Sequence, residues 1–238
     1  MKILSIDTST AVMGVALLKE NKIIAETTTN LKTNHSVRLM PTIDQLFSEV
    51  QWSPEQIEMI AVAKGPGSYT GVRIGVTTAK TLAWSLNIPI VGVSTLEAMA
   101  YNNHHYPGSI APIIDARRGQ VYTGLYTRLE GSWTLLESDR IILLADWLKQ
   151  LIHSNDQILF VGDDVYQHSG MIVNELLDQA DFADSTFNFP RPSVIGTIAL
   201  SKLRKGEIDN HYDFNPAYLQ LAEAEVKWLE KNSNCLKE

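Results

Sequence analysis

Cysteine is almost missing from this chain, with one residue, Cys235, among 238. A single thiol cannot build a disulfide framework or a thiolate metal site within one chain. This scarcity favours a reducing compartment, so we expect a cytoplasmic protein. No run approaches the roughly 20 apolar residues of a membrane span. The start of the chain also turns polar at Asp7, too early for a secretory signal. We therefore expect no membrane partner.

Positive charge is also scarce, because 20 Lys and Arg against 27 Asp and Glu give a net charge of −7. Contacts to nucleic-acid phosphates need clustered Lys and Arg, so we expect a poor nucleic-acid binder when the chain is alone. The apolar share of 45% and the charged share of 20% are those of a soluble globular protein. The length allows one large domain or two small ones.

A glycine-rich stretch follows a short apolar run at 60–63 and predicts a strand, a loop and a helix that reaches Leu86. No Gly-Lys-Ser/Thr follows the glycines, so this is not the phosphate loop of nucleotide triphosphatases. The spacing does not match the dinucleotide fingerprint either. Two interpretations stay open: helix-start amides that bind an anion, or a structural turn that packs a helix tightly on a sheet. Capping by Ser68 or Thr70 is expected. The residues of this glycine loop are Gly65, Pro66, Gly67, Ser68, Thr70, Gly71 and Arg73.

A strand that ends in aspartate and enters a polar turn occurs twice, at 3–18 and at 110–126. The recurrence predicts an internal duplication of a βββα unit in an α/β protein with a mixed sheet. An Asp followed by hydroxyls suits a magnesium-bound phosphate or a nucleotide. The alternative is an Asx or Ser/Thr turn that closes a hairpin. The candidate residues are Asp7, Thr8 and Ser9 in the first turn, and Asp115 and Arg117 in the second.

A turn-rich break at 102–108 predicts a boundary between subdomains 1–103 and 104–215, followed by a helix over 216–231. His104 and His105 lie in this break. Adjacent residues point apart on any regular element, so we predict no metal pair there.

Two helices, expected over 36–50 and 72–86, carry more apolar surface than one core contact needs. Together they are expected to form a helix bundle with the same helices of a partner. The alternative is ordinary core packing within the monomer. The predicted interface residues are Val37, Leu39, Met40, Ile43, Leu46 and Phe47 on the first helix, and Gly75, Thr78 and Leu82 on the second.

Several longer motifs carry a family resemblance: Ile6-Asp-Thr-Ser9, the stretch from Gly65 to Gly75, Ala79-Lys-Thr-Leu82, Gly92-Val-Ser-Thr-Leu-Glu97, Ile114-Asp-Ala-Arg117, Val121-Tyr122, Val161-Gly-Asp163 and Pro216-Ala-Tyr-Leu219. They resemble the bacterial TsaB family, also called YeaZ, over nearly the whole chain. The resemblance implies the actin/sugar-kinase/heat-shock-ATPase fold, with two duplicated βββαβαβα halves. It also implies that the helix at 216–231 packs back on the first half.

The resemblance further implies a role in making N6-threonylcarbamoyladenosine at position 37 of tRNAs that read codons beginning with A. In that system the paralogue TsaD performs the transfer and TsaE is an ATPase, while TsaB is the partner that TsaD needs. The implied partners are therefore TsaD, TsaE and a second copy of this chain. Transfer RNA is expected only through the complex, with Lys64, Arg73, Lys80, Arg117 and Arg118 either contributing to a composite surface or solvated.

TsaD carries a His-x-x-x-His metal pair on a stretch similar to 92–100, and Thr95 and Met99 stand at the matching positions here. We therefore expect no metal and no catalysis by this chain. The second polar turn lacks the glycines of active kinases, so the resemblance implies a vestigial nucleotide cleft. No cofactor is expected to be required, and ATP or ADP is possible at the interface of the complex. The implied cleft residues are Asp7, Thr8, Ser9, Asp115, Arg117 and Gly162.

One alternative is a stand-alone ATP-dependent phosphoryl transferase or ATPase that uses Asp7 and Asp115 around magnesium-ATP. A peptidase is a weaker alternative, because Ser9, Ser36 and Ser68 fit no nucleophile elbow and have no identifiable base nearby.

Overall fold

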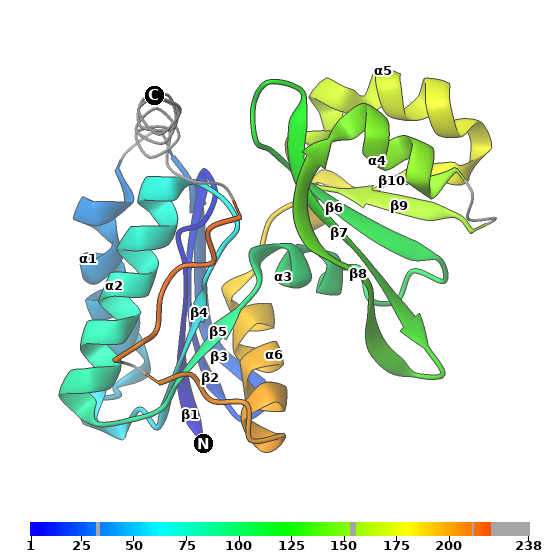
Figure 1. Ribbon diagram of the computed structural model, residues 1–238. Helices are drawn as coiled ribbons and strands as arrows, with labels where there is room; N and C mark the ends of the chain where they lie inside the picture. The colour runs from blue at the N-terminus through cyan, green and yellow to red at the C-terminus, as the bar shows by residue number, and fades with distance from the viewer. Residues whose placement is uncertain (32–33, 153–155, 211, 220–238) are drawn as a thin grey trace, which may run out of the picture.

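The first half of the chain forms a mixed five-stranded sheet with strand order β3-β2-β1-β4-β5 (Figure 1). The structure is a computed structural model, and it describes residues 1–31, 34–152, 156–210 and 212–219. Strands β1 to β3 are antiparallel, whereas β4 and β5 run parallel to β1. The elements are β1 (Lys2–Asp7), β2 (Val12–Lys19), β3 (Lys22–Asn30), α1 (His35–Val50), η1 (Pro54–Gln56), β4 (Met59–Ala63), α2 (Tyr69–Leu86), β5 (Ile90–Val93) and α3 (Thr95–Tyr101).

The second half repeats this plan in a sheet with strand order β10-β9-β6-β7-β8. The first three strands are again antiparallel, and β9 and β10 follow the direction of β6. The elements are β6 (Ser109–Asp115), β7 (Gln120–Leu129), β8 (Ser132–Leu143), α4 (Leu144–Leu151), β9 (Ile158–Val161), α5 (Val165–Leu176), η2 (Leu177–Gln179), β10 (Ala180–Phe182), η3 (Ser185–Phe187) and α6 (Pro192–Arg204).

Both halves therefore have the order βββαβαβα and the same sheet connectivity. The duplication read from the two strand-Asp-turn motifs is confirmed. This is the doubled architecture of the actin/sugar-kinase/heat-shock-ATPase class. Among the described residues no helix has the length and apolar character that crossing a bilayer requires.

The last helix of each half packs on the sheet of the other half. Helix α6 lies against β1, β2, β4 and β5, where Ile195, Ile198 and Ala199 meet Ile3 and Leu18. Helix α3 lies against β6 and β7. Figure 1 shows α3 and α6 between the two sheets, while α1 and α2 cover the outer face of the first sheet.

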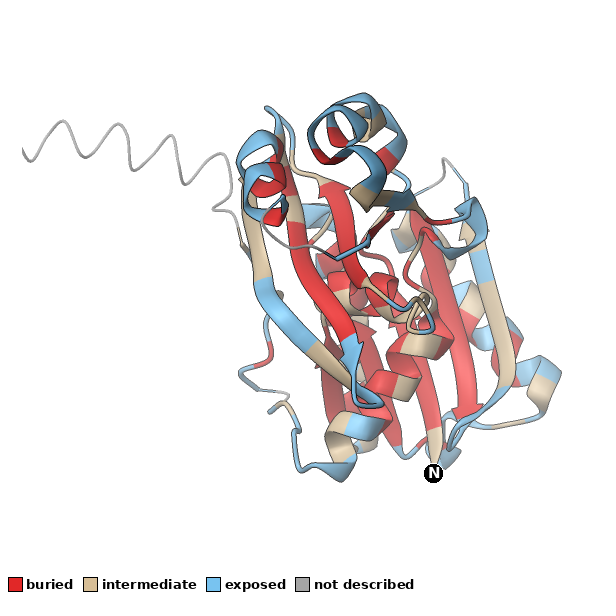
Figure 2. Ribbon diagram, turned by 90° about the vertical axis from the view of Figure 1, so that its right-hand side faces the viewer, coloured by how far each residue is buried: buried red, intermediate tan, exposed pale blue. Residues whose placement is uncertain are grey.

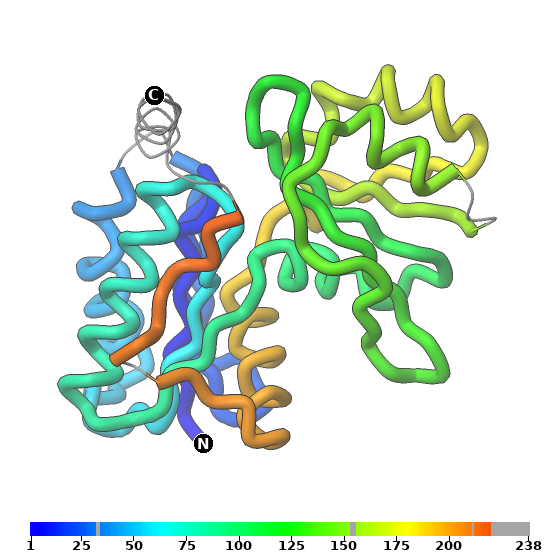
Figure 3. Tube along the Cα trace, in the orientation of Figure 1, coloured from blue at the N-terminus to red at the C-terminus, as the bar shows by residue number. Residues whose placement is uncertain are grey.

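Helix α6 and the buried Phe214 therefore pack with the first half and α3 packs with the second, so these contacts cross the boundary predicted between 1–103 and 104–215. Past α6 the chain forms a strap, described at residues 207–210 and 212–219, which Figure 3 traces beside α2. Ala217 N donates to Lys64 O over 2.7 Å, and the Phe214 side chain is buried in the first core. Residues 216–219 are not helical, so the helix expected over 216–231 does not begin at Pro216, and 220–231 lie outside the described residues.

The two sheets are buried at their central strands, which Figure 2 shows in red. Alternating side chains of β1 separate the two cores of the first half, because Leu4 and Ile6 face α1 and α2 while Ile3 faces α6. The same alternation decides where the polar residues at the end of β1 point.

Candidate functional site

The glycine loop packs directly against the polar turn that follows β1. Ser68 N donates to Ser9 O over 2.8 Å, and Thr8 Oγ1 donates to Gly71 O over 2.7 Å. A Cβ atom on Gly67 would lie 2.2 Å from Ser9 O, and one on Gly71 would lie 2.1 Å from Thr8 O. Both distances are far below contact range, so only glycine allows this approach of the two backbones.

The same packing explains Gly75 and the start of α2. A Cβ on Gly75 would lie 2.5 Å from Thr8 Oγ1, so this glycine faces the polar turn and not a second helix. Its predicted place on a helix–helix interface is therefore corrected. Ser68 Oγ accepts a hydrogen bond from Gly71 N over 3.3 Å, which confirms Ser68 as the helix cap. These contacts support the structural interpretation of the loop.

Asp7 is fully buried at the end of β1. Its Oδ1 atom accepts hydrogen bonds from Ser9 N (2.9 Å) and Ser9 Oγ (2.6 Å), which form an Asx turn. Its buried Oδ2 atom has no hydrogen-bond partner in the described part of the chain. Burial raises the pKa of Asp7 to about 7, and the Ser9 hydrogen bonds only partly offset this.

The start of α6 lies over the sheet beside Asp7. Asp7 lies two residues after Ser5, which faces Gly196 of α6, so both side chains point to the α6 side of the sheet. Gly14 lies opposite Asp7 on β2, and a Cβ on Gly14 would lie 2.7 Å from Pro192 Cδ. Pro192 therefore covers the sheet beside Asp7. A covered carboxyl whose pKa is raised is a weaker candidate for a magnesium ligand than an exposed, ionised one.

The second polar turn, at the end of β6, is more open. Arg117 N donates to Asp115 Oδ1 over 3.2 Å, and His168 Nε2 lies 3.7 Å from the same oxygen. Arg117 and Arg118 both adopt left-handed φ angles, 66° and 56°. Such angles are costly for residues other than glycine. The predicted residues Asp115 and Arg117 therefore share one turn.

Gly162 and Met99 meet where α3 packs on the second sheet. A Cβ on Gly162 would lie 3.0 Å from Met99 Cε and 2.2 Å from Ile113 O. Met99 is buried in an apolar cluster with Leu96 and Ile110. Thr95 is fully buried at the start of α3, where its N atom donates to Gly65 O over 3.0 Å. Within the described ranges no group of three His, Cys, Asp or Glu residues could hold a metal ion.

A polar cluster around Asp139 joins the two halves, and the sequence analysis missed it. Ser94 Oγ and Tyr126 OH both donate to Asp139, and Lys202 Nζ donates to Glu97 Oε2 over 2.9 Å. Burial raises the pKa of Asp139, and these two hydroxyl donors lower it in part. Ser94 at a helix start was the one available signal.

The predicted interface is also corrected for four of its residues on α1. Leu39 and Leu46 are 1% and 2% exposed, and Ile43 and Phe47 are also buried, all within the monomer core. Val37 and Met40 are 67% and 48% exposed, and Thr78 and Leu82 are half-buried. A small hollow of about 100 Å³ lies between Met40 and Leu82. The outward surface here, which we call the α1–α2 face, consists of Val37, Met40, Thr78 and Leu82.

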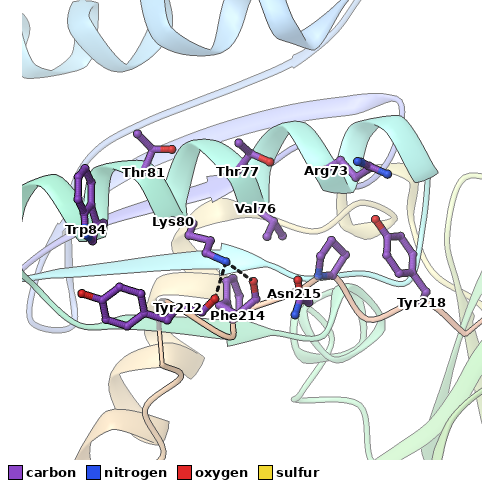
Figure 4. Close-up of a pocket in the computed structure, with 11 residues that line it drawn as sticks. Arg73, Val76, Thr77, Lys80, Thr81, Trp84, Tyr212, Phe214, Asn215 and Tyr218 are labelled. Atoms are coloured by element: carbon purple, nitrogen blue, oxygen red, sulfur yellow. Dashed lines mark hydrogen bonds between the residues drawn. The ribbon is translucent and has the colours of Figure 1, made fainter.

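A larger groove of about 760 Å³ lies on the other side of α2, between this helix and the strap (Figure 4). In Figure 4, Trp84 and Tyr212 stand at one end of the groove, and Arg73 and Tyr218 stand at the other. Lys80 Nζ donates to Tyr212 O (3.0 Å) and Phe214 O (3.2 Å) and so ties the strap to the helix. We call this the strap groove, and its lining residues are Arg73, Val76, Thr77, Lys80, Thr81, Trp84, Tyr212, Phe214, Asn215, Pro216 and Tyr218.

Known proteins share this sequence along almost its full length. The TsaB protein of Bacillus subtilis, named for tRNA threonylcarbamoyladenosine biosynthesis, is 48% identical over 97% of this chain and 99% of its own. The TsaB protein of Haemophilus influenzae is 34% identical, with 96% of each chain covered. The chain belongs to the TsaB family.

Two further comparisons agree with TsaB membership. Residues 22–228 match the family model described as TsaD, tRNA N6-adenosine threonylcarbamoyltransferase. The solved structure of YeaZ from Pseudomonas aeruginosa superimposes with a TM-score of 0.74 at 27% identity, covering 92% of this chain and 99% of that one. The resemblance stated from the motifs is therefore confirmed as family membership.

Proposed function

We propose that this TsaB-family chain takes part in forming N6-threonylcarbamoyladenosine at position 37 of tRNAs that read codons beginning with A, as the non-catalytic partner subunit of TsaD. The observation that supports a non-catalytic role is the burial of two side chains on α3. TsaD has a metal-binding His pair at the positions of Thr95 and Met99. Here both side chains are buried, and Met99 packs among apolar residues.

The α1–α2 face is the proposed docking surface for TsaD and, in its absence, for a second copy of this chain. Val37 and Met40 are the most exposed apolar side chains of α1. Met40 lines the hollow beside Leu82, which a partner side chain would fill. A two-fold pairing of such a face is self-complementary, so the same residues serve both partners.

TsaE is proposed to join the complex, and tRNA is proposed to bind only once it is assembled. No cofactor is required by this chain in this proposal, and ATP or ADP is placed at the interface between subunits. The surroundings of Asp7 support the absence of hydrolysis, because its side chain is buried and its Oδ1 is held by Ser9. The proposed compartment is the cytoplasm.

A reconstitution with one protein left out at a time tests the function. Purified chain, TsaD, TsaE, ATP, threonylcarbamoyl-adenylate and unmodified tRNA are mixed, and the modified nucleoside is measured by mass spectrometry after digestion. We expect modification only when this chain is present, and neither modification nor ATP hydrolysis by the chain alone. ATP turnover by the pure chain would instead favour the phosphoryl transferase, with Asp7 and Asp115 as its catalytic candidates.

Met40→Glu tests the docking surface, with Met171→Glu as the matched control. Met40 is 48% exposed on α1 and Met171 is 46% exposed on α5, so neither charge has to enter the core. We expect the first substitution to weaken TsaD binding at least about tenfold in calorimetry, because a charge at the centre of an apolar contact stays desolvated. The control should bind as the wild type does. Equal binding by both variants would remove the α1–α2 face from the proposal.

A further inference from the structure

The strap groove is positively charged in an acidic protein. Its described lining contains two cations, Arg73 and Lys80, and no Asp or Glu, whereas the chain as a whole carries −7. Lys80 makes its two hydrogen bonds to carbonyl oxygens, so no carboxylate in those contacts cancels its charge. The local positive charge of the groove favours an anionic ligand.

Aromatic rings stand at both ends of the same groove. Trp84 is 61% exposed and Tyr212 is 70% exposed at one end (Figure 4). At the other end Tyr218 stacks on Tyr69 at 5.3 Å between ring centres, and Arg73 lies over Tyr69. Trp84 and Arg73 are eleven residues apart on α2, which is about 16 Å along a helix. A mononucleotide has one base and can stack on only one of these two aromatic platforms. The distance between the platforms corresponds to several nucleotides of a single strand.

Hydroxyl groups line the space between the platforms. Thr77 and Thr81 are exposed on α2 beside Lys80. Threonine, lysine and arginine side chains are common donors to nucleic-acid phosphates. A cationic groove with aromatic platforms is the usual design of sites that bind single-stranded nucleic acid without strong sequence preference.

We infer that the strap groove binds a short single-stranded RNA segment, with one base stacked on Trp84 and Tyr212 and another near Tyr218, and with the intervening phosphates beside Arg73 and Lys80. This inference rests on the proposed function, because it assigns this chain a direct contact to the RNA that the complex modifies. The strap sets the width of the site, since Lys80 anchors it by two hydrogen bonds.

The position of the groove is compatible with partner docking. Arg73, Thr77, Lys80 and Trp84 recur at spacings of three and four residues and so share one side of α2. Thr78 and Leu82 of the α1–α2 face lie on the opposite side of the same helix. RNA in the groove therefore lies next to the proposed partner without competing for its surface.

Binding to the assembled complex of the full-length chain with TsaD and TsaE is measured by fluorescence anisotropy with a labelled eight-nucleotide single-stranded RNA at several salt concentrations. We expect Trp84→Ala and Tyr212→Ala to weaken binding about 5- to 150-fold. Arg73→Gln should lower the slope of log affinity against log salt by about 0.7. The altered side chains are exposed, so thermal unfolding should be unchanged. Tyr166→Ala, an exposed aromatic on α5, and Lys149→Gln, an exposed cation on α4, are matched controls and should bind normally.

Three results would overturn the inference. The first is no binding of the RNA by the wild type, and the second is an equal loss of RNA binding in the control variants. The third is complete displacement of the labelled RNA by ADP or by an acidic peptide at the concentration at which unlabelled RNA displaces it. The reconstitution described above separates this from the proposed function. If the wild type supports tRNA modification and Trp84→Ala supports it equally with unchanged RNA affinity, only the groove assignment fails. If the wild type does not support modification but the groove variants still lose RNA binding, only the proposed function fails.

Discussion

The two strand-Asp-turn motifs have the same place in the two halves but opposite surroundings. Asp7 is fully buried, covered on the side of Pro192 and held by its own Asx turn. Asp115 is partly exposed beside His168. The comparison shows that the two halves share the same backbone path, whereas the helix packed against each turn determines how far its aspartate is buried. The turn at Asp7 has become part of the core, and the turn at Asp115 remains a surface feature.

Disrupting the close contact between the backbone at Gly71 and the first turn should have the largest effect on stability. A Cβ at position 71 meets the Thr8 carbonyl at 2.1 Å, and backbone cannot move aside as a flexible side chain can. We expect Gly71→Ala to lower the free energy of unfolding by at least about 4 kcal/mol, or to prevent folding. Gly170→Ala is the control, because nothing lies within 4 Å of that Cβ in α5 and alanine favours a helix. Urea denaturation of both variants measures the difference, and similar midpoints would contradict the packing role.

Asp7→Asn tests the burial of the first carboxyl through pH. Burial raises the pKa of Asp7 from 3.8 to about 7. Below pH 4 the carboxyl is protonated in both the folded and the unfolded chain. Between about pH 4 and 7 only the unfolded chain releases the proton, so the stability of the wild type falls as pH rises, and above pH 7 the loss is constant. We expect the asparagine variant to gain up to about 4 kcal/mol relative to the wild type between pH 4 and 8.

The measurement is urea unfolding of wild type and Asp7→Asn across that pH range. Asparagine keeps an oxygen that can accept from Ser9, so the hydrogen bonds of the turn persist. A stability difference that stays constant with pH would show that Asp7 is ionised in the folded protein and would restore it as a magnesium ligand candidate.

Asp115→Asn applies the same substitution to the second turn and should have the smallest effect. The amide oxygen can still accept from Arg117 N, and the lost contact to His168 spans 3.7 Å in a partly exposed site. We expect a change in the free energy of unfolding within about 1 kcal/mol. A change as large as that of Asp7→Asn would mean that the two turns are equivalent after all.

The sequence predicted the sheets well because strand periodicity and turn residues are local signals. The doubled strand-Asp-turn pattern was enough to predict the duplicated halves, and the glycine spacing was enough to place the loop before α2. The short strand β10 was not predicted, because three residues carry little periodicity.

The functional surfaces were harder to predict, because each depends on contacts between distant residues. Leu39 and Leu46 have the pattern of an interface, but the packing of α1 against β2 and β3 buries them in the monomer core. Pro192 covers Gly14 beside Asp7 from a distant part of the chain, and the strap groove depends on Tyr212 and Phe214 returning to α2. No local pattern in the sequence states which helix covers which sheet.

The crossing of α6 onto the first sheet also affects how the chain matures on the ribosome. Residues 1–103 leave the ribosome without the helix that covers Ile3, Leu18 and Val91, so this apolar face waits for 192–204. The second half, together with α3, is built from the continuous stretch 95–187. All residues of its core are therefore synthesised before α6, which the first half still lacks. The N-terminal sheet is thus the first to be synthesised and the last to be closed, and its exposed face is the part of the nascent chain most prone to aggregation.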